Sequence, residues 1–285
     1  MPWLLALPGL VALVAFHFLP IGFGAFYAFT NWNGLSHATW IGLENFREIS
    51  GDEVARGAVW HTLELAGCFA VSVNVIGLTL ALGLHRAVKT RNVLRTLFFA
   101  PVALSPLAIA LLWRWIFDDQ GALNRTLDDV GLGSWQPEFG WTADPSTALW
   151  TILIVMIWQY SGLAMVLYLA GLQGIPEEIY EATLVDGAST WLRLRKIVLP
   201  LLAPALTVSA TLTLIIGLRV FDQVLALTEG GPAGGTETLA TQVYKQMFSA
   251  GRFGYSAAFA LILTALITVM ALTQLALLRR NEARR

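Results

Sequence analysis

The chain has 285 residues, of which 56% are hydrophobic and only 13% are charged. Soluble domains carry about 25% charged residues, so this composition indicates a membrane protein. The formal net charge of −1 provides no overall field to attract nucleic acid, and a single cysteine, Cys68, excludes an internal disulfide.

Six stretches are long and apolar enough to cross a membrane as helices, which takes about 20 mostly apolar residues. They lie near residues 3–29, 58–83, 94–117, 146–171, 200–222 and 256–278. The first stretch is too long for the apolar part of a signal peptide and has no basic segment before it, which argues against cleavage. The sequence therefore predicts an all-α, polytopic membrane protein with six transmembrane helices.

Lysine and arginine are distributed unevenly among the predicted loops. Three loops hold 11 of them in 47 residues: 84–95, 172–199 and 279–285. The other three hold five in 89 residues: 30–57, 118–145 and 223–255. Because loops rich in basic residues stay in the cytoplasm, both termini and the 172–199 loop are expected on the cytoplasmic side.

The segment 177–200 interrupts the apolar pattern with four acidic and three basic residues. Pro176 suits a helix start, and Glu178 lies in the first turn, where a carboxylate meets the positive end of the helix dipole. The helix is predicted to run to about Val185. Gly187 then ends it, because glycine readily adopts the left-handed backbone of a helix end.

A second short helix is predicted to begin at Ser189, which suits the N-cap position. Its apolar residues share one face at helical spacing, and its basic residues lie elsewhere. The apolar set is Trp191, Leu194, Val198 and Leu201, and the basic set is Arg193, Arg195 and Lys196. From the residues alone, two alternatives stay open: an amphipathic hairpin at the membrane surface, or a docking element for a cytoplasmic partner.

The loop also carries a motif. The spacing of Glu181-Ala182, Gly187 and Ile197-x-Leu199-Pro200 resembles the EAA motif in permease subunits of binding-protein-dependent ABC importers. Thr183 stands where the third residue of this motif is usually alanine.

Further stretches resemble the carbohydrate-uptake branch of these permeases, and within it the maltose F-type subunit. They are NWNG (31–34), IGLENF (41–46), LAGLQGIP (169–176), FDQ (221–223), LTEGGP (227–232) and TET (236–238). The resemblance covers nearly the whole chain.

The resemblance implies the type I ABC importer permease fold, with residues 1–57 forming the first transmembrane helix and an external loop. Residues 58–285 would form a five-helix core, with 172–199 as the coupling loop that docks an ATPase subunit. The docking residues it implies are Glu178, Glu181, Ala182, Asp186, Gly187 and Ala188. The small residues would let the ATPase subunit approach the loop closely, and the acidic residues could pair with basic groups of that subunit.

The resemblance also implies that the chain lies in the bacterial cytoplasmic (inner) membrane and works with several partners. They are a second, homologous permease subunit, two ATP-binding subunits that use ATP and Mg²⁺, and an extracytoplasmic sugar-binding protein. This chain has no G-x-x-x-x-G-K-[ST] motif, so it is expected to bind no cofactor itself. It lacks the K-G-type tail of the G-type partner, so we expect a heterodimer.

Polar residues inside predicted spans are candidates for the substrate path. Arg219 and Asp222 could neutralise each other at i and i+3, or could face a water-filled cavity. Trp158 could offer an aromatic face to a sugar, or could pack in the core. The resemblance points to the same two helices, and the candidate set is Trp158, Gln159, Tyr160, Gly217, Arg219, Phe221 and Asp222.

Other polar residues in the spans are expected to have structural roles. His61 and Glu64 lie one turn apart and would form a solvated pair, Arg114 would reach the membrane surface, and Asn74 would bond to a neighbouring helix. No metal-ligand spacing or catalytic motif is found, so this chain is not expected to be an enzyme. ATP hydrolysis is expected from separate partner subunits. The alternatives are an ion-coupled secondary transporter, a membrane-embedded enzyme, or the same importer carrying a polyol or a glycerophosphodiester.

Overall fold

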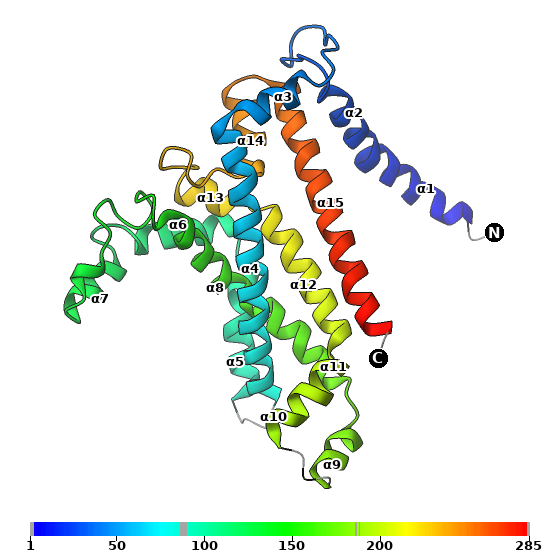
Figure 1. The fold of residues 1–285 in the computed structure, drawn as a ribbon, viewed down its shortest axis with the longest axis vertical. Helices are drawn as coiled ribbons and strands as arrows, with labels where there is room; N and C mark the ends of the chain where they lie inside the picture. The colour runs from blue at the N-terminus through cyan, green and yellow to red at the C-terminus, as the bar shows by residue number, and fades with distance from the viewer. Residues whose placement is uncertain (1–2, 86–89, 186, 188, 284–285) are drawn as a thin grey trace.

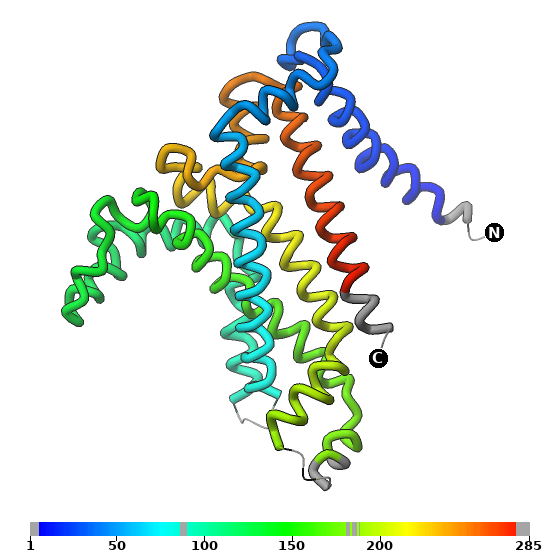
Figure 2. Tube along the Cα trace, viewed as in Figure 1, coloured from blue at the N-terminus to red at the C-terminus, as the bar shows by residue number. Residues whose placement is uncertain are grey.

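The computed structural model of the chain describes residues 3–85, 90–185, 187 and 189–283 (Figures 1 and 2). Its α-helices are α1 (Trp3–Leu13), α2 (Leu19–Tyr27), α3 (Glu44–Gly51), α4 (Glu53–His85), α5 (Arg91–Phe99), α6 (Pro106–Ile116), α7 (Ala122–Asp129), α8 (Ala148–Gln173), α9 (Glu177–Val185), α10 (Thr190–Arg193), α11 (Leu199–Leu201), α12 (Ala203–Leu218), α13 (Asp222–Leu227), α14 (Leu239–Tyr244) and α15 (Phe253–Ala283). Short π-helical turns (Val14–Phe18, Leu194–Val198 and Lys245–Ser249) and 3₁₀ turns (Ala100–Ala103 and Gly133–Trp135) complete the regular elements. The predicted all-α fold class is therefore confirmed.

Four helices are long and apolar enough to cross a membrane: Ala6–Tyr27, Glu53–His85, Ala148–Gln173 and Phe253–Leu277. The predicted spans near 94–117 and 200–222 each correspond to a bent pair of helices. The first is bent by 99° between Arg91–Ala103 and Pro106–Ile116, and the second by 70° between Thr190–Leu201 and Ala203–Leu218. The described residues thus offer four spans, or up to six if each bent pair is one span.

The backbone leaves helical geometry at the first bend, and departs from it only slightly at the second. Ser105 is extended, with ψ 131°, because the ring of Pro106 disfavours a helical conformation in the residue before it. Leu202 has ψ −2°, just before α12 begins. Hydropathy measures how long an apolar segment is, but not the direction in which its helix runs. The two bends could therefore not be predicted from hydropathy.

Helices α4, α8 and α12 form the centre of the molecule, and α8 is the most deeply enclosed (Figure 1). A polar contact ties the three together. The Asn74 side chain donates to Thr213 Oγ1 at 2.8 Å and accepts from the Tyr168 hydroxyl at 2.6 Å. The expected bond from Asn74 to a neighbouring helix is thus confirmed.

The two ends of the bundle carry different elements (Figure 1). We call the end with α3 and α14 the α14 end, and the opposite end, with α9 and α10, the α9 end. Helices α6 and α7 project sideways near the α14 end, as the green trace in Figure 2 shows, and α1 stands apart from the bundle. Both chain termini point towards the α9 end.

Candidate functional site

The 172–199 loop folds as two short helices joined by a sharp turn. Helix α9 begins at Glu177, directly after Pro176, and ends at Val185, as predicted. Glu178 is exposed on its first turn. Thr183, at the third position of the motif, is buried and donates its hydroxyl to Tyr180 O at 2.7 Å. The hydroxyl that replaces an alanine methyl is therefore satisfied within the helix.

Gly187 adopts a left-handed conformation with φ 65°, as expected for a residue that ends a helix. An added Cβ would meet no atom within 4 Å, so the turn faces open space. Ser189 caps the next helix by accepting a hydrogen bond from Leu192 N at 3.3 Å, which confirms the predicted cap. Asp186 and Ala188 lie outside the described residues, as do the side chains of Glu181 and Ala182 on α9.

The apolar face predicted for the second helix is only partly buried. Val198 is buried and Leu194 is half-buried, whereas Trp191 and Leu201 are exposed. The chain winds as a π-helix from Leu194 to Val198, which changes the register that a uniform period of 3.6 residues assumes. That the four apolar side chains share one face stays a prediction.

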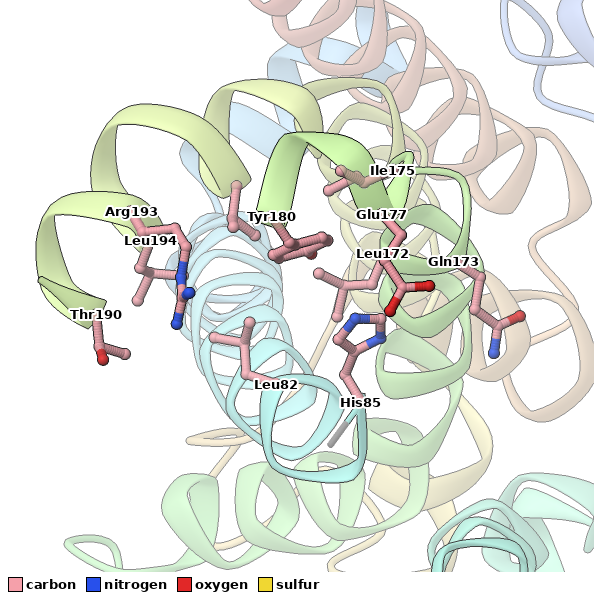
Figure 3. Close-up of a pocket in the computed structure, with 11 residues that line it drawn as sticks. Leu82, His85, Leu172, Gln173, Ile175, Glu177, Tyr180, Thr190, Arg193 and Leu194 are labelled. Atoms are coloured by element: carbon pink, nitrogen blue, oxygen red, sulfur yellow. The ribbon is translucent and has the colours of Figure 1, made fainter. Parts of the chain in front are cut away.

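A cavity of about 640 Å³ separates this loop from the ends of α4 and α8 (Figure 3). Leu82 and His85 come from α4, and Leu172 and Gln173 come from α8. The loop closes the other side of the cavity through Ile175, Glu177, Tyr180, Thr190, Arg193, Leu194 and Val198. This cavity lies at the joint between the loop and the transmembrane helices.

Tyr180 fastens α9 to the rest of the molecule. Together with Ile175 and Leu194, its side chain packs against the main buried cluster, and its ring lies 5.9 Å from that of His85. Burial raises the pKa of the Tyr180 phenol, while the nearby positive charge of Arg193 opposes the shift. Helix α9 therefore contacts the main buried cluster through Tyr180.

A second site lies between α8 and the break that separates α12 from α13. Its cleft of about 210 Å³ is lined by the candidates Tyr160, Arg219, Phe221 and Asp222. Pro106 and Gln223 line it as well. The structure thus brings four of the seven expected substrate-path residues together, beside the bend before α6.

Gln159 lies beneath this cleft and not in its wall. It is 1% exposed, accepts a hydrogen bond from Gln223 Nε2 at 3.0 Å and donates one to Leu104 O at 3.4 Å. These bonds connect α8, α13 and the bend before α6 under the cleft.

Trp158 and Gly217 lie away from the cleft lining. The Trp158 side chain is 44% exposed and packs edge-on against Trp113, with ring centroids 5.5 Å apart. Gly217 faces α4, where an added Cβ would come within 2.8 Å of Ala66 Cα. Its lack of a side chain lets α12 approach α4 closely.

Arg219 and Asp222 both line the cleft, but no ion pair joins them in the part of the chain that the structure describes. Arg219 is exposed and Asp222 is half-buried. A direct ion pair between the two charges is therefore not seen, and both residues lie in the wall of the cleft.

Some polar contacts at the α14 end were missed or misjudged from the sequence. His61 does not pair with Glu64; its Nδ1 lies 3.1 Å from Glu237 O. Arg114 donates to Ala226 O at 3.3 Å, and its Nη1 lies 3.8 Å from Glu229 Oε1; that it also reaches the membrane surface stays a prediction. No spacing in the sequence indicates these contacts, because their partners are 112 to 176 residues away.

Among the described residues, no group of three or more histidine, cysteine, aspartate or glutamate side chains could hold a metal ion. Residues expected to function from the sequence gather at two places, the joint at the α9 end and the cleft nearer the α14 end. Helix α8 contributes to both, through Tyr160 at the cleft and Leu172 at the joint.

Comparison with known proteins gives one family match. Residues 73–282 match the model of the binding-protein-dependent transport system inner membrane component. Among characterised sequences, the chain is 35% identical to a probable starch degradation products transport system permease protein, AmyD, of Thermoanaerobacterium thermosulfurigenes, covering 98% of this chain and 94% of that protein.

Two further relatives have similar coverage. The chain is 33% identical to the multiple sugar-binding transport system permease protein MsmF of Streptococcus mutans, covering 98% of this chain and 96% of the relative. It is 32% identical to the trehalose/maltose transport system permease protein MalF of Thermococcus litoralis, covering 93% of this chain and 89% of the relative.

A crystal structure of a bacterial ABC transporter involved in the import of the acidic polysaccharide alginate contains a chain of similar fold. The TM-score is 0.85 at 24% identity, and the match covers 98% of this chain and 96% of that one. This last likeness concerns the fold.

Proposed function

This chain belongs to the family of binding-protein-dependent transport system inner membrane components, and we propose that it imports a sugar or oligosaccharide as one subunit of an ATP-driven ABC importer. As a permease component it is a multi-pass inner membrane protein, and a separate subunit hydrolyses ATP.

Sugar as the substrate class is supported by the names of relatives and by the chemistry of the cleft. The relatives AmyD, MsmF and MalF are named for carbohydrate transport and align over nearly the whole chain. Tyr160 and Phe221 offer aromatic rings, and Arg219, Asp222 and Gln223 offer hydrogen-bonding groups. Such a set suits a molecule with apolar C–H faces and a rim of hydroxyl groups. A polyol or a glycerophosphodiester remains the alternative substrate.

The observation that carries the coupling mechanism is the continuity of α8 between the two sites. Leu172, at the joint, lies twelve positions after Tyr160, at the cleft, which is about 18 Å along one helix. Both ends are packed: Tyr180 fastens α9 beside Leu172, and Gln159 bonds to Gln223 under the cleft. A displacement of α9 can therefore reach the cleft through one rigid element.

In this mechanism, the 172–199 loop docks on an ATPase subunit. The exposed Glu178 and the open turn at Gly187 support docking, and Glu181, Ala182, Asp186 and Ala188 complete the proposed surface. Closure of the ATPase subunits on ATP and Mg²⁺ would push α9, and α8 would transmit the movement. The cleft would then alternate between opening to the outside and opening to the cytoplasm.

The proposed assembly contains this chain, a second homologous permease subunit, two ATP-binding subunits and an extracytoplasmic sugar-binding protein. The chain would lie in the bacterial inner membrane with both termini in the cytoplasm, because the α9 end carries the basic loops. The two permease subunits would form a heterodimer around the pathway.

The deciding experiment is uptake by proteoliposomes that contain the complete complex, with labelled sugars offered together with the binding protein. We expect uptake to require ATP on the ATPase side and to be indifferent to proton or sodium gradients. Uptake driven by an ion gradient in vesicles without ATPase subunits would instead identify an ion-coupled secondary transporter.

A further inference from the structure

The carboxylate of Glu237 is a buried charge that the proposed function does not use. The residue is only 4% exposed, and its side chain forms an ion pair with the ammonium group of Lys245. Thr241 also donates its hydroxyl to the Glu237 carboxylate at 2.6 Å. A carboxylate removed from water is tolerated only when it is paired and hydrogen-bonded, so the surrounding structure is built to hold this charge.

The pair closes the loop between α13 and α14. Lys245 also donates to Glu229 O, at 2.6 Å, so one ammonium group connects the start of the loop to its end. Gly230 has φ 83° and lies so close to the Glu237 carboxylate that any larger residue would collide with it. Thr228 and Thr236 share a hydrogen bond of 2.7 Å across the loop.

The closed loop is also bonded to two neighbouring parts of the molecule. His61 on α4 lies 3.1 Å from Glu237 O, and Thr62 accepts a hydrogen bond from Leu239 N at 2.9 Å. Thr238 donates its hydroxyl to Val220 O at 3.2 Å, within the break that lines the cleft. The loop that the Glu237–Lys245 pair closes is thus bonded both to α4 and to the break that lines the cleft.

Helix α13 links this loop to the cleft on its other side. It begins at Asp222, which lines the cleft, and ends at Leu227, one residue before the loop. Most residues of α13 are buried, so the helix is held in place by its surroundings. Because it is short, a shift of the loop at one end of α13 would move the cleft residues at the other end. Fixing the loop therefore fixes the orientation of Phe221 and Asp222 at the cleft.

From this geometry we propose that Glu237 and Lys245 are a positioning pair, which holds the 220–222 segment so that the cleft responds to a loaded binding protein. The proposal rests on the proposed function. The pair touches no substrate, and it acts through the loop and α13. When it is lost, the cleft wall moves independently of the binding protein, and ATP hydrolysis proceeds without delivery of substrate.

The test compares three variants in the full complex: Lys245→Met, Glu237→Gln, and the double variant. The exposed pair formed by Glu48 and Arg252 at the same end, with N–O separation 2.6 Å, supplies the control Glu48→Gln/Arg252→Met. Measurements are the yield of assembled complex, ATPase activity with and without the loaded binding protein, and the KM and maximal rate of uptake.

Lys245→Met alone should lower the yield of complex, because the buried carboxylate loses its partner. The double variant should assemble normally, since no buried charge is left unpaired, yet its ATPase stimulation by the binding protein should fall about tenfold, within the usual range for coupling between two sites. The control should keep both yield and stimulation.

A double variant that regains both yield and stimulation would show that the pair is only structural, and would overturn the proposal. Equal loss of stimulation in the control would also overturn it. These results are separate from the proposed function, which fails only if the wild-type complex shows no ATP-dependent uptake.

Discussion

Gly187 illustrates how one residue can serve both the fold and a partner. Its φ of 65° ends α9, and the space around its Cα is open. A larger side chain there would strain the backbone by roughly 1–2 kcal/mol, and would also stand where a docked ATPase subunit must approach. The two effects can be separated because the chain has a second glycine with the same geometry.

We predict that Gly187→Leu inserts into the membrane normally but no longer co-purifies with the ATPase subunits, and that uptake is lost. Gly131→Leu is the matched control. Gly131 also has a left-handed backbone, with φ 76°, and open space, but it lies in the loop after α7, far along the chain from the docking loop. Normal co-purification of the ATPase with Gly187→Leu would refute docking at this turn.

Arg219 offers a second test at the level of one residue. A hydrogen bond to a charged group contributes about 1.5–3 kcal/mol, so Arg219→Ala should lower uptake at limiting substrate by about tenfold or more while the complex still assembles. Trp158→Ala, which alters a ring outside the cleft lining, should change uptake much less. Poor assembly of Arg219→Ala that Asp222→Asn restores would mean that the two charges form a structural pair.

At the scale of elements, the link between α8 and α13 is a buried amide pair. Gln159→Leu would leave the Gln223 amide without its acceptor, at a cost of about 1–3 kcal/mol. We therefore expect a lower melting temperature for the purified complex. The double variant Gln159→Leu/Gln223→Leu should recover part of the loss, because replacing both partners by apolar groups leaves fewer groups unsatisfied. Equal melting temperatures for the single and double variants would argue against this link.

Some helix starts, ends and caps could be predicted from local residues of the sequence alone. Pro176, Gly187 and Ser189 act within a few residues of themselves, and the helix–turn–helix that they predict agrees with the structure. The bends near 104 and 202 were not predicted, because apolar content carries no information about direction. Neighbouring residues on a helix also face different ways, so Trp158 and Tyr160 could not be assigned to one cleft before the packing of α8 was known.

Long-range contacts could not be predicted at all from spacing. Glu237 lies in a loop whose glycines and threonines indicate an exposed turn, yet its side chain is buried and paired with the half-buried Lys245. His61, 176 residues earlier, lies with its Nδ1 3.1 Å from the backbone carbonyl oxygen of Glu237. Burial of this kind depends on how α4 and α14 meet, and a single sequence records that only indirectly.

For the whole molecule, docking of an ATPase subunit on the 172–199 loop requires that the α9 end face the cytoplasm. Ser189 and Gly235 lie in loops at opposite ends of the bundle, and both are exposed. In a Cys68→Ser background, Gly235→Cys should react with an impermeant maleimide in intact cells, and Ser189→Cys only after permeabilisation. Labelling of residue 189 from outside would reverse the orientation and remove the docking surface from the cytoplasm.

The central claim is that movement of α9 at the joint reaches the cleft through α8. The most direct measurement places an environment-sensitive fluorophore on Phe221→Cys, in a Cys68→Ser background, within the complete complex in lipid nanodiscs. ATP bound to ATPase subunits that cannot hydrolyse it should change the emission of the fluorophore, with the same ATP dependence as closure of those subunits. Closure of the ATPase subunits without any change in emission at the cleft would contradict the account.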